Sequence, residues 1–206
     1  MNKVIIGFFI ALMFWFIMFS PITAQKVNFW AVMFFAGLVL SVYSIFSLKD
    51  QIKKLMIFNY KHLAIGVISA ILLYFIFYIG RNVSINLFEF SSQQISSVYS
   101  TKQGTPIWLI SVLLIFIIGP AEEIFWRGFI QTKIVELTGK PFLSIILATI
   151  LYTIVHIWAF NTILLIAAFV CGLFWGIMFN KYNSLVPVII SHSLWDFTVF
   201  VLFPFN

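Results

Sequence analysis

Seven long apolar runs, separated by short polar breaks, are the feature that most constrains the fold of this chain. A helix of about 20 apolar residues crosses the hydrocarbon core of a membrane, whereas the strands of a membrane barrel alternate in pieces of about 10 residues. The runs are longer than such strands and apolar on all sides, so we expect an all-α, polytopic transmembrane helical bundle. The expected spans are Val4–Phe19, Val27–Phe46, Leu63–Ile79, one that begins at Ile107, Phe142–Phe160, Thr162–Phe179 and Leu185–Phe203.

The composition excludes several other classes of protein. The chain is 63% hydrophobic and 9% charged, against about 45–50% apolar and about 25% charged residues in a soluble domain. A disordered chain needs the opposite composition, and a disulfide scaffold needs more than the single Cys171. The net charge of +6 is too thinly spread for a nucleic-acid surface. We expect a multi-pass protein of the cell membrane whose surroundings are the lipid bilayer.

The first span has an alternative interpretation as a signal peptide, because Lys3 precedes it and Pro21 follows it. The segment Asn82–Thr105 is the long polar connection, and we expect a flexible surface loop there. The alternative is an interfacial flap that gates access to a site. Gly172 and Gly176 form a G-x-x-x-G pattern, which we interpret as a close helix contact within the chain.

Lysine and arginine placement predicts the orientation in the membrane, because cytoplasmic loops carry an excess of both. With the N-terminus inside, the outer side holds only Lys26, Arg81 and Lys102, and the basic segment Leu48–His62 is an inner loop suited to anionic headgroups. The inner side then holds Lys3, Lys49, Lys53, Lys54, Lys61, Lys133, Lys140 and Lys181, together with Arg127 if that residue lies outside the membrane.

Ionisable residues inside the apolar runs are the candidates for function. A charge at the membrane centre costs about 2.5–3.5 kcal/mol on insertion scales, so such residues normally partner one another or face a wet cavity. They mark a functional site by default. The candidates are Glu122, Glu123, Arg127, His156, His192 and Asp196.

The spacing of the acids in the fourth span predicts different roles for them. Glu123 and Arg127 are four residues apart with the acid first, the favourable order for a pair on one helix face. Glu122 is turned about 100° away, so it lacks a cation on its own helix and could act as a base in a poorly solvated pocket. Pro120 predicts a kink or a new helix start. The alternative is that both acids only hold helices together.

The histidines lie on two later spans. His192 and Asp196 are four residues apart and share one face of the last helix. The alternative to a functional role is a structural one. His192 and Asp196 would then form a local pair that holds the last helix in register, and His156 would be a packing residue. The rise of a helix places Glu122 and His156 at similar depths, about 22 and 21 Å from the inner ends of their spans. His192 comes out shallower, at about 10 Å, unless its helix begins nearer Lys181 or is tilted.

These residues resemble the motifs of the CPBP intramembrane proteases, a family that includes CAAX prenyl endopeptidases and bacteriocin-processing or self-immunity relatives. The family's Glu-Glu-x-x-x-Arg motif is matched by Glu122 to Arg127. Its aromatic-x-x-x-His motif is matched by Tyr152 and His156, although phenylalanine is the usual aromatic. Its His-x-x-x-Asn/Asp motif is matched by His192 and Asp196. The resemblance covers roughly residues 107 to 203.

The resemblance implies a glutamate-type intramembrane endopeptidase, a class formerly labelled metalloproteases. The resemblance implies that Glu122 is the general base, that His156 positions the attacking water molecule, and that the third motif stabilises the oxyanion. An ionised Asp196 only accepts hydrogen bonds, so it would either have to be protonated or orient His192 as the donor. We expect the second arrangement. The substrate would be a peptide or a membrane protein, and bacteriocin or leader-peptide processing or self-immunity are the roles that fit. We divide the chain into N-terminal helices and polar loops (1–105) and the catalytic core (106–206).

Three alternatives remain open. Glu, His and Asp side chains could bind Zn²⁺, although we expect no cofactor and no metal. A non-catalytic immunity or scaffold protein could use the same fold. A proton-coupled transporter could also use such residues, but the sequence lacks the repeat symmetry of many transporters.

Overall fold

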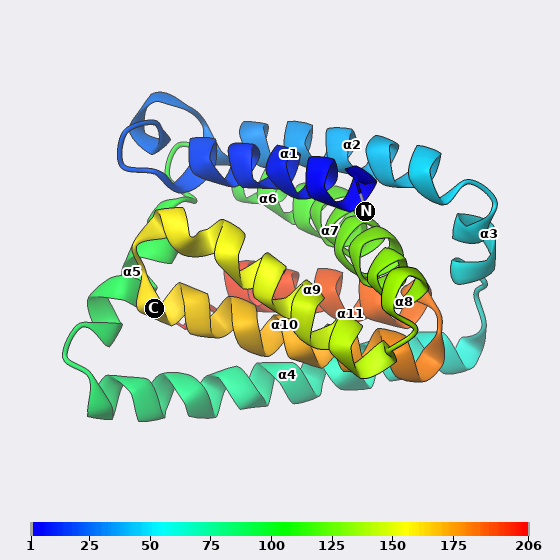
Figure 1. The fold of residues 1–206 in the computed structure, drawn as a ribbon. Helices are drawn as coiled ribbons and strands as arrows, with labels where there is room; N and C mark the ends of the chain where they lie inside the picture. Colours follow the sequence, from blue (N-terminus) through cyan, green and yellow to red (C-terminus); the bar gives the residue numbers. More distant parts are fainter. Residues whose placement is uncertain (1, 206) are drawn as a thin grey trace.

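The computed structural model describes residues 2–205, and all regular elements among them are helices (Figure 1). Seven helical stretches are long and apolar enough to cross a membrane. The expected all-α polytopic bundle is therefore confirmed. The stretches are α1 (Asn2–Phe19), α2 (Phe29–Leu48), α4 (Tyr60–Leu87), α6 to α8 (Ile107–Thr138), α9 with η4 (Pro141–Ala159), α10 (Thr162–Tyr182) and α11 with η5 (Leu185–Leu202).

The fourth stretch continues through Pro120 instead of restarting there. It consists of α6 (Ile107–Leu113), the π-helical η2 (Leu114–Ile118), α7 (Gly119–Glu123), the π-helical η3 (Ile124–Gln131) and α8 (Thr132–Thr138). Wider π turns on both sides accommodate a proline that cannot donate to the preceding turn. They also place more residues in each turn, so distances along this helix are shorter than α-helical arithmetic predicts.

The segment Asn82–Thr105 is not the flexible loop that we expected. Helix α4 continues to Leu87, well beyond the predicted span, and α5 (Ser91–Ser100) follows after a short turn. Ile95, Val98 and Tyr99 lie at helical spacing and line a cavity, so an apolar face holds this polar helix against the bundle. Tertiary packing of these residues overrides the loop-like composition.

The spanning helices are arranged with α1 and α2 on one face of the molecule and α4 on the opposite face (Figure 1). Helix α4 packs on α11 (Leu185–Phe197), and α9 (Pro141–Val155) packs on α10. A Cβ atom at Gly172 would lie 2.8 Å from Thr149 Cγ2. The glycine pattern in α10 therefore makes a close contact within the chain, as the sequence predicts.

The connections between helices gather at two opposite ends of the bundle. At one end, Asn28 Nδ2 donates to Thr105 Oγ1 over 3.1 Å, and Asn161 Nδ2 donates to the Gln94 carbonyl over 2.8 Å. At the other end, Gln51 Nε2 donates to Glu136 Oε1 over 2.9 Å. The first end, called here the α5 end, carries Lys26, Arg81 and Lys102. The second carries Lys3, Lys49, Lys53, Lys54, Lys61, Lys133, Lys140 and Lys181.

Candidate active site

Glu123 is the centre of a buried charged cluster that joins three helices. Its Oε1 atom lies 2.8 Å from Arg127 Nη1 and 2.6 Å from His192 Nδ1. The three side chains are at most 3% exposed. The pair with Arg127 is the one that the spacing predicts, whereas the contact with His192 joins α7 to α11 and is not visible in the sequence.

Arg127 also binds the backbone of a third helix. Its Nη2 atom donates to the carbonyls of Cys171 and Gly172 in α10, each over 3.3 Å. The guanidinium carbon lies 5.5 Å from the centroid of the Trp175 ring, within the range of a cation–π contact. Arg127 therefore balances the charge of Glu123 and fixes the distance between η3 and α10.

His192 is held from several sides. Its ring stacks on Trp175, with the centroids 3.8 Å apart and the planes inclined by 19°. Its Nε2 atom lies 3.4 Å from Asp196 Oδ2, in addition to the Nδ1 contact with Glu123. Both ring nitrogens thus face carboxylate oxygens, and a protonated imidazole would donate to both.

Helix arithmetic predicts that His192 lies at a shallower depth than the acids of the fourth span. This prediction is wrong, because the side chains of His192 and Glu123 are in contact. Two features account for the difference. The π-helical turns of η3 bring Glu123 nearer to the inner end of its span. Gly119 also allows close approach of the helices, since a Cβ atom there would lie 3.0 Å from the Ser193 Cα atom. An estimate from the sequence that assumes ideal, separate α-helices includes neither feature.

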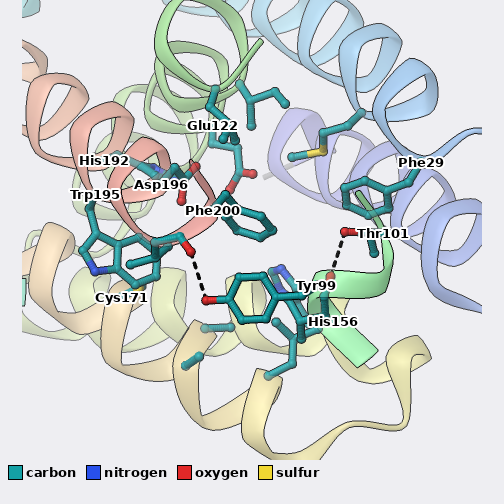
Figure 2. A pocket seen from close by; sticks show the side chains of 18 of the residues that line it. Phe29, Tyr99, Thr101, Glu122, His156, Cys171, His192, Trp195, Asp196 and Phe200 are labelled. Atoms are coloured by element: carbon teal, nitrogen blue, oxygen red, sulfur yellow. Dashed lines mark hydrogen bonds and ion pairs between the residues drawn. The ribbon is translucent and has the colours of Figure 1, made fainter. Parts of the chain in front are cut away.

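Glu122 points away from this cluster into a cavity. It is 8% exposed, and its Oε2 atom is buried without a hydrogen-bond partner among the described residues. His156, His192 and Asp196 line the same cavity. Figure 2 shows Glu122, His192 and Asp196 on one side of the cavity and His156 with Tyr99 on the other. The two acids of the first motif therefore differ in environment, as their spacing predicts.

His156 directly follows the last residue of α9 and has a defined tautomer. Its Nδ1 atom lies 2.8 Å from the Tyr152 carbonyl, which can only accept, so Nδ1 carries the proton. The indole Nε1 of Trp15 donates to His156 Nε2 over 3.0 Å. Trp15 is 1% exposed and comes from α1. Sequence reasoning missed this residue, because nothing distinguishes it from the other aromatic residues of the first span.

The cavity has a volume of about 200 Å³ and a largely apolar wall. It lies toward the α5 end of the bundle, since Phe29, Tyr99, Thr101 and Phe205 contribute to its lining. Trp30 Nε1 donates to the Thr101 carbonyl over 2.9 Å and ties the α5 segment to α2. The cavity therefore combines a few buried polar groups with a wall suited to an apolar ligand.

The carboxylates and imidazoles of the site are mostly engaged with one another or with neighbouring groups. His192 contacts both Glu123 and Asp196, and both nitrogens of His156 have partners. Among residues 2–205, no group of three or more His, Cys, Asp or Glu side chains is arranged to hold a metal ion.

A comparison with protein families covers the part of the chain that contains all three motifs. Residues 104–198 match the family model described as type II CAAX prenyl endopeptidase, Rce1-like. This region is a CPBP-family domain. The CPBP domain holds every candidate site residue, whereas Trp15 and Tyr99 lie outside it. The match identifies a family of CAAX-protease-like intramembrane endopeptidases, and the seven helices make the chain a multi-pass membrane protein. No curated protein and no solved structure matched the chain significantly.

Proposed function

We propose that the protein is a glutamate-type intramembrane endopeptidase in which Glu122 activates a water molecule. The observation that carries the proposal is the contrast between two adjacent acids. Glu123 is neutralised by Arg127 and His192, whereas Glu122 faces the cavity with an oxygen that lacks a partner. A carboxylate with an unpaired oxygen in a poorly solvated cavity is suited to general base catalysis.

In the proposed reaction, Glu122 takes a proton from water while the water oxygen attacks the carbonyl carbon of the scissile peptide bond. The N–H of His192 Nε2 leaves its 3.4 Å contact with Asp196 and donates to the oxyanion of the tetrahedral intermediate, while Glu123 holds the ring through Nδ1. Donors of this kind in a dry site contribute about 2.7–4 kcal/mol. The protonated Glu122 then returns the proton to the leaving nitrogen as the carbon–nitrogen bond breaks. No step requires a metal ion.

His156 has to exchange one partner before it can contact that water. Both of its nitrogens are engaged, Nδ1 by the Tyr152 carbonyl and Nε2 by the Trp15 indole. A water molecule that donates to Nε2 would take the place of the indole. We therefore place the resting enzyme in a state in which Trp15 covers His156, and substrate entry would displace it.

The engaged His156 also favours a second candidate, a non-catalytic immunity or scaffold protein with the same fold. In that case the cavity would bind a peptide without cleaving it, and the contact between Trp15 and His156 would be permanent. The two candidates differ in whether Glu122 is needed for chemistry or only for shape.

The substrate we propose is a peptide or membrane protein that reaches the site from the outer side of the cell membrane. The cavity lies at the α5 end, which carries few basic residues, and the positive-inside rule places that end outside. A leader peptide, a bacteriocin or another short membrane peptide would fit this direction of access.

The decisive experiment compares Glu122→Gln with Glu136→Gln in cells and after reconstitution. Glutamine keeps the shape of the side chain but cannot take a proton. Glu136 is an exposed acid at the opposite end and serves as the matched control. We expect Glu122→Gln to accumulate uncleaved peptides in a proteomic survey while Glu136→Gln behaves as wild type, and we expect cleavage to persist with chelators. Full cellular activity of Glu122→Gln would disprove the protease mechanism.

A further inference from the structure

The segment Phe203–Phe205, which follows η5 (Thr198–Leu202), turns back against α4 and α5. Both main-chain groups of Phe205 are bound by side chains of other helices. Its N–H donates to the Tyr99 hydroxyl oxygen over 2.9 Å, and its carbonyl accepts from Arg81 Nε over 2.6 Å. The two partners come from α5 and α4, so two helices hold the backbone of one residue between them.

The hydroxyl of Tyr99 is oriented for this role. It donates to the Val199 carbonyl over 3.0 Å, which leaves its oxygen free to accept from an amide. Burial raises the pKa of the Tyr99 phenol above its usual value of 10.0, so the group stays protonated at physiological pH. Arg81 supplies a cationic donor that a carbonyl oxygen accepts well. Together they recognise the backbone of a peptide and not a particular side chain.

The side chain of Phe205 lies where two cavities meet. It lines the cavity that contains Glu122 and His156, and it also lines a second cavity of about 160 Å³ between α4, α5 and α10. Its ring stacks on Tyr74, with the centroids 5.2 Å apart and the planes inclined by 25°. An aromatic side chain in this position therefore reaches from the lipid-facing helices toward the candidate catalytic groups.

We propose that Tyr99 and Arg81 form a binding subsite for an extended substrate peptide with a large apolar side chain, and that Phe203–Phe205 occupies it as an internal competitor. The proposal rests on the proposed function, because it names the place where a peptide substrate is held. The occupant is a peptide and not a lipid chain, since a lipid ester offers no N–H that could donate to the Tyr99 hydroxyl. The apolar second cavity receives the side chain of the bound residue.

Peptide binding can be measured without catalysis, so the test is made in the Glu122→Gln background in nanodiscs. The probe is a fluorescently labelled Phe-Pro-Phe-amide, whose binding is followed by anisotropy. Phe205→Ala removes the competing ring, and we expect the probe to bind about tenfold tighter, because a tethered segment competes at a high effective concentration. Phe203→Ala is the control, since Phe203 is 62% exposed and neither cavity includes it.

Loss of the backbone partners should have the opposite effect. Adding Tyr99→Phe or Arg81→Gln to the Phe205→Ala background should weaken probe binding about fivefold, the effect of one hydrogen bond. A probe methylated on the nitrogen of its last residue cannot donate to Tyr99. We expect this probe to bind as weakly as the normal probe binds Tyr99→Phe, with no further loss when both changes are combined.

The signs of these effects decide the proposal. Tighter binding with Phe205→Ala and weaker binding with Tyr99→Phe support a subsite and an internal competitor. Weaker or unchanged binding with Phe205→Ala would show that the segment is only part of the fold and would overturn the proposal. If Phe205→Ala does not fold, Phe205→Leu gives the same test with a smaller expected gain. Binding without cleavage by the wild type would leave this subsite intact and count against the protease mechanism alone.

Discussion

Replacing Arg127 by methionine tests the buried cluster most directly. The 2.8 Å contact with Glu123 is worth about 6 kcal/mol of attraction at an effective dielectric constant of about 20, before the cost of desolvation is subtracted. Removing one partner of a buried pair typically costs about 3–5 kcal/mol. Arg127→Met also removes the guanidinium donor from two α10 carbonyls. Because His192 still faces Glu123 at 2.6 Å, we expect a loss near the lower limit, about 3 kcal/mol.

The assay is equilibrium unfolding in mixed micelles, with Lys133→Met as the matched control. Lys133 pairs with Glu136 at 2.7 Å, but these side chains are 20% and 41% exposed, so the loss should stay below about 1 kcal/mol. Adding Glu123→Gln to Arg127→Met should restore about 1–2 kcal/mol, because no buried anion then lacks its guanidinium. Equal losses for Arg127→Met and Lys133→Met, or no recovery in the double variant, would refute the reasoning.

Three further predictions concern the site, the orientation and the packing. Trp15→Phe keeps an aromatic ring but removes the indole that covers His156, so we expect a higher rate of single-turnover cleavage. A lower rate would show that the contact is needed for chemistry. Cysteines introduced at exposed Ser96 and Lys54 should react with a membrane-impermeant maleimide in intact cells only at position 96, and the reverse pattern would invert the proposed orientation. Gly172→Ala should cost about 1–3 kcal/mol through overpacking, whereas Gly80→Ala, with no atom within 4 Å of the added Cβ, should leave the unfolding free energy unchanged or slightly higher.

The parts of the structure that could be predicted depend on local spacing. The seven spans follow from long apolar runs, because lipid requires helices of that length. The contact between Glu123 and Arg127 follows from the helical period, as does the approach of His192 to Asp196. Both pairs lie within one turn of a single helix, so no knowledge of the tertiary fold is needed.

The parts that could not be predicted depend on how distant helices meet. The contact between His192 and Glu123 requires close packing of α7 and α11 at Gly119. The donor for His156 comes from Trp15, 141 residues earlier in the chain. The polar composition around α5 indicates a loop, yet an apolar face packs it over the cavity. A one-dimensional pattern contains no information about these approaches.

The hydrogen bond from Trp15 has a practical consequence for protein engineering. A chimera that exchanges α1 for another hydrophobic anchor would insert into membranes and retain all three sequence motifs. It would nevertheless lack the indole that donates to His156 Nε2. A transplanted unit that keeps this contact therefore extends beyond residues 104–198 and includes the first helix.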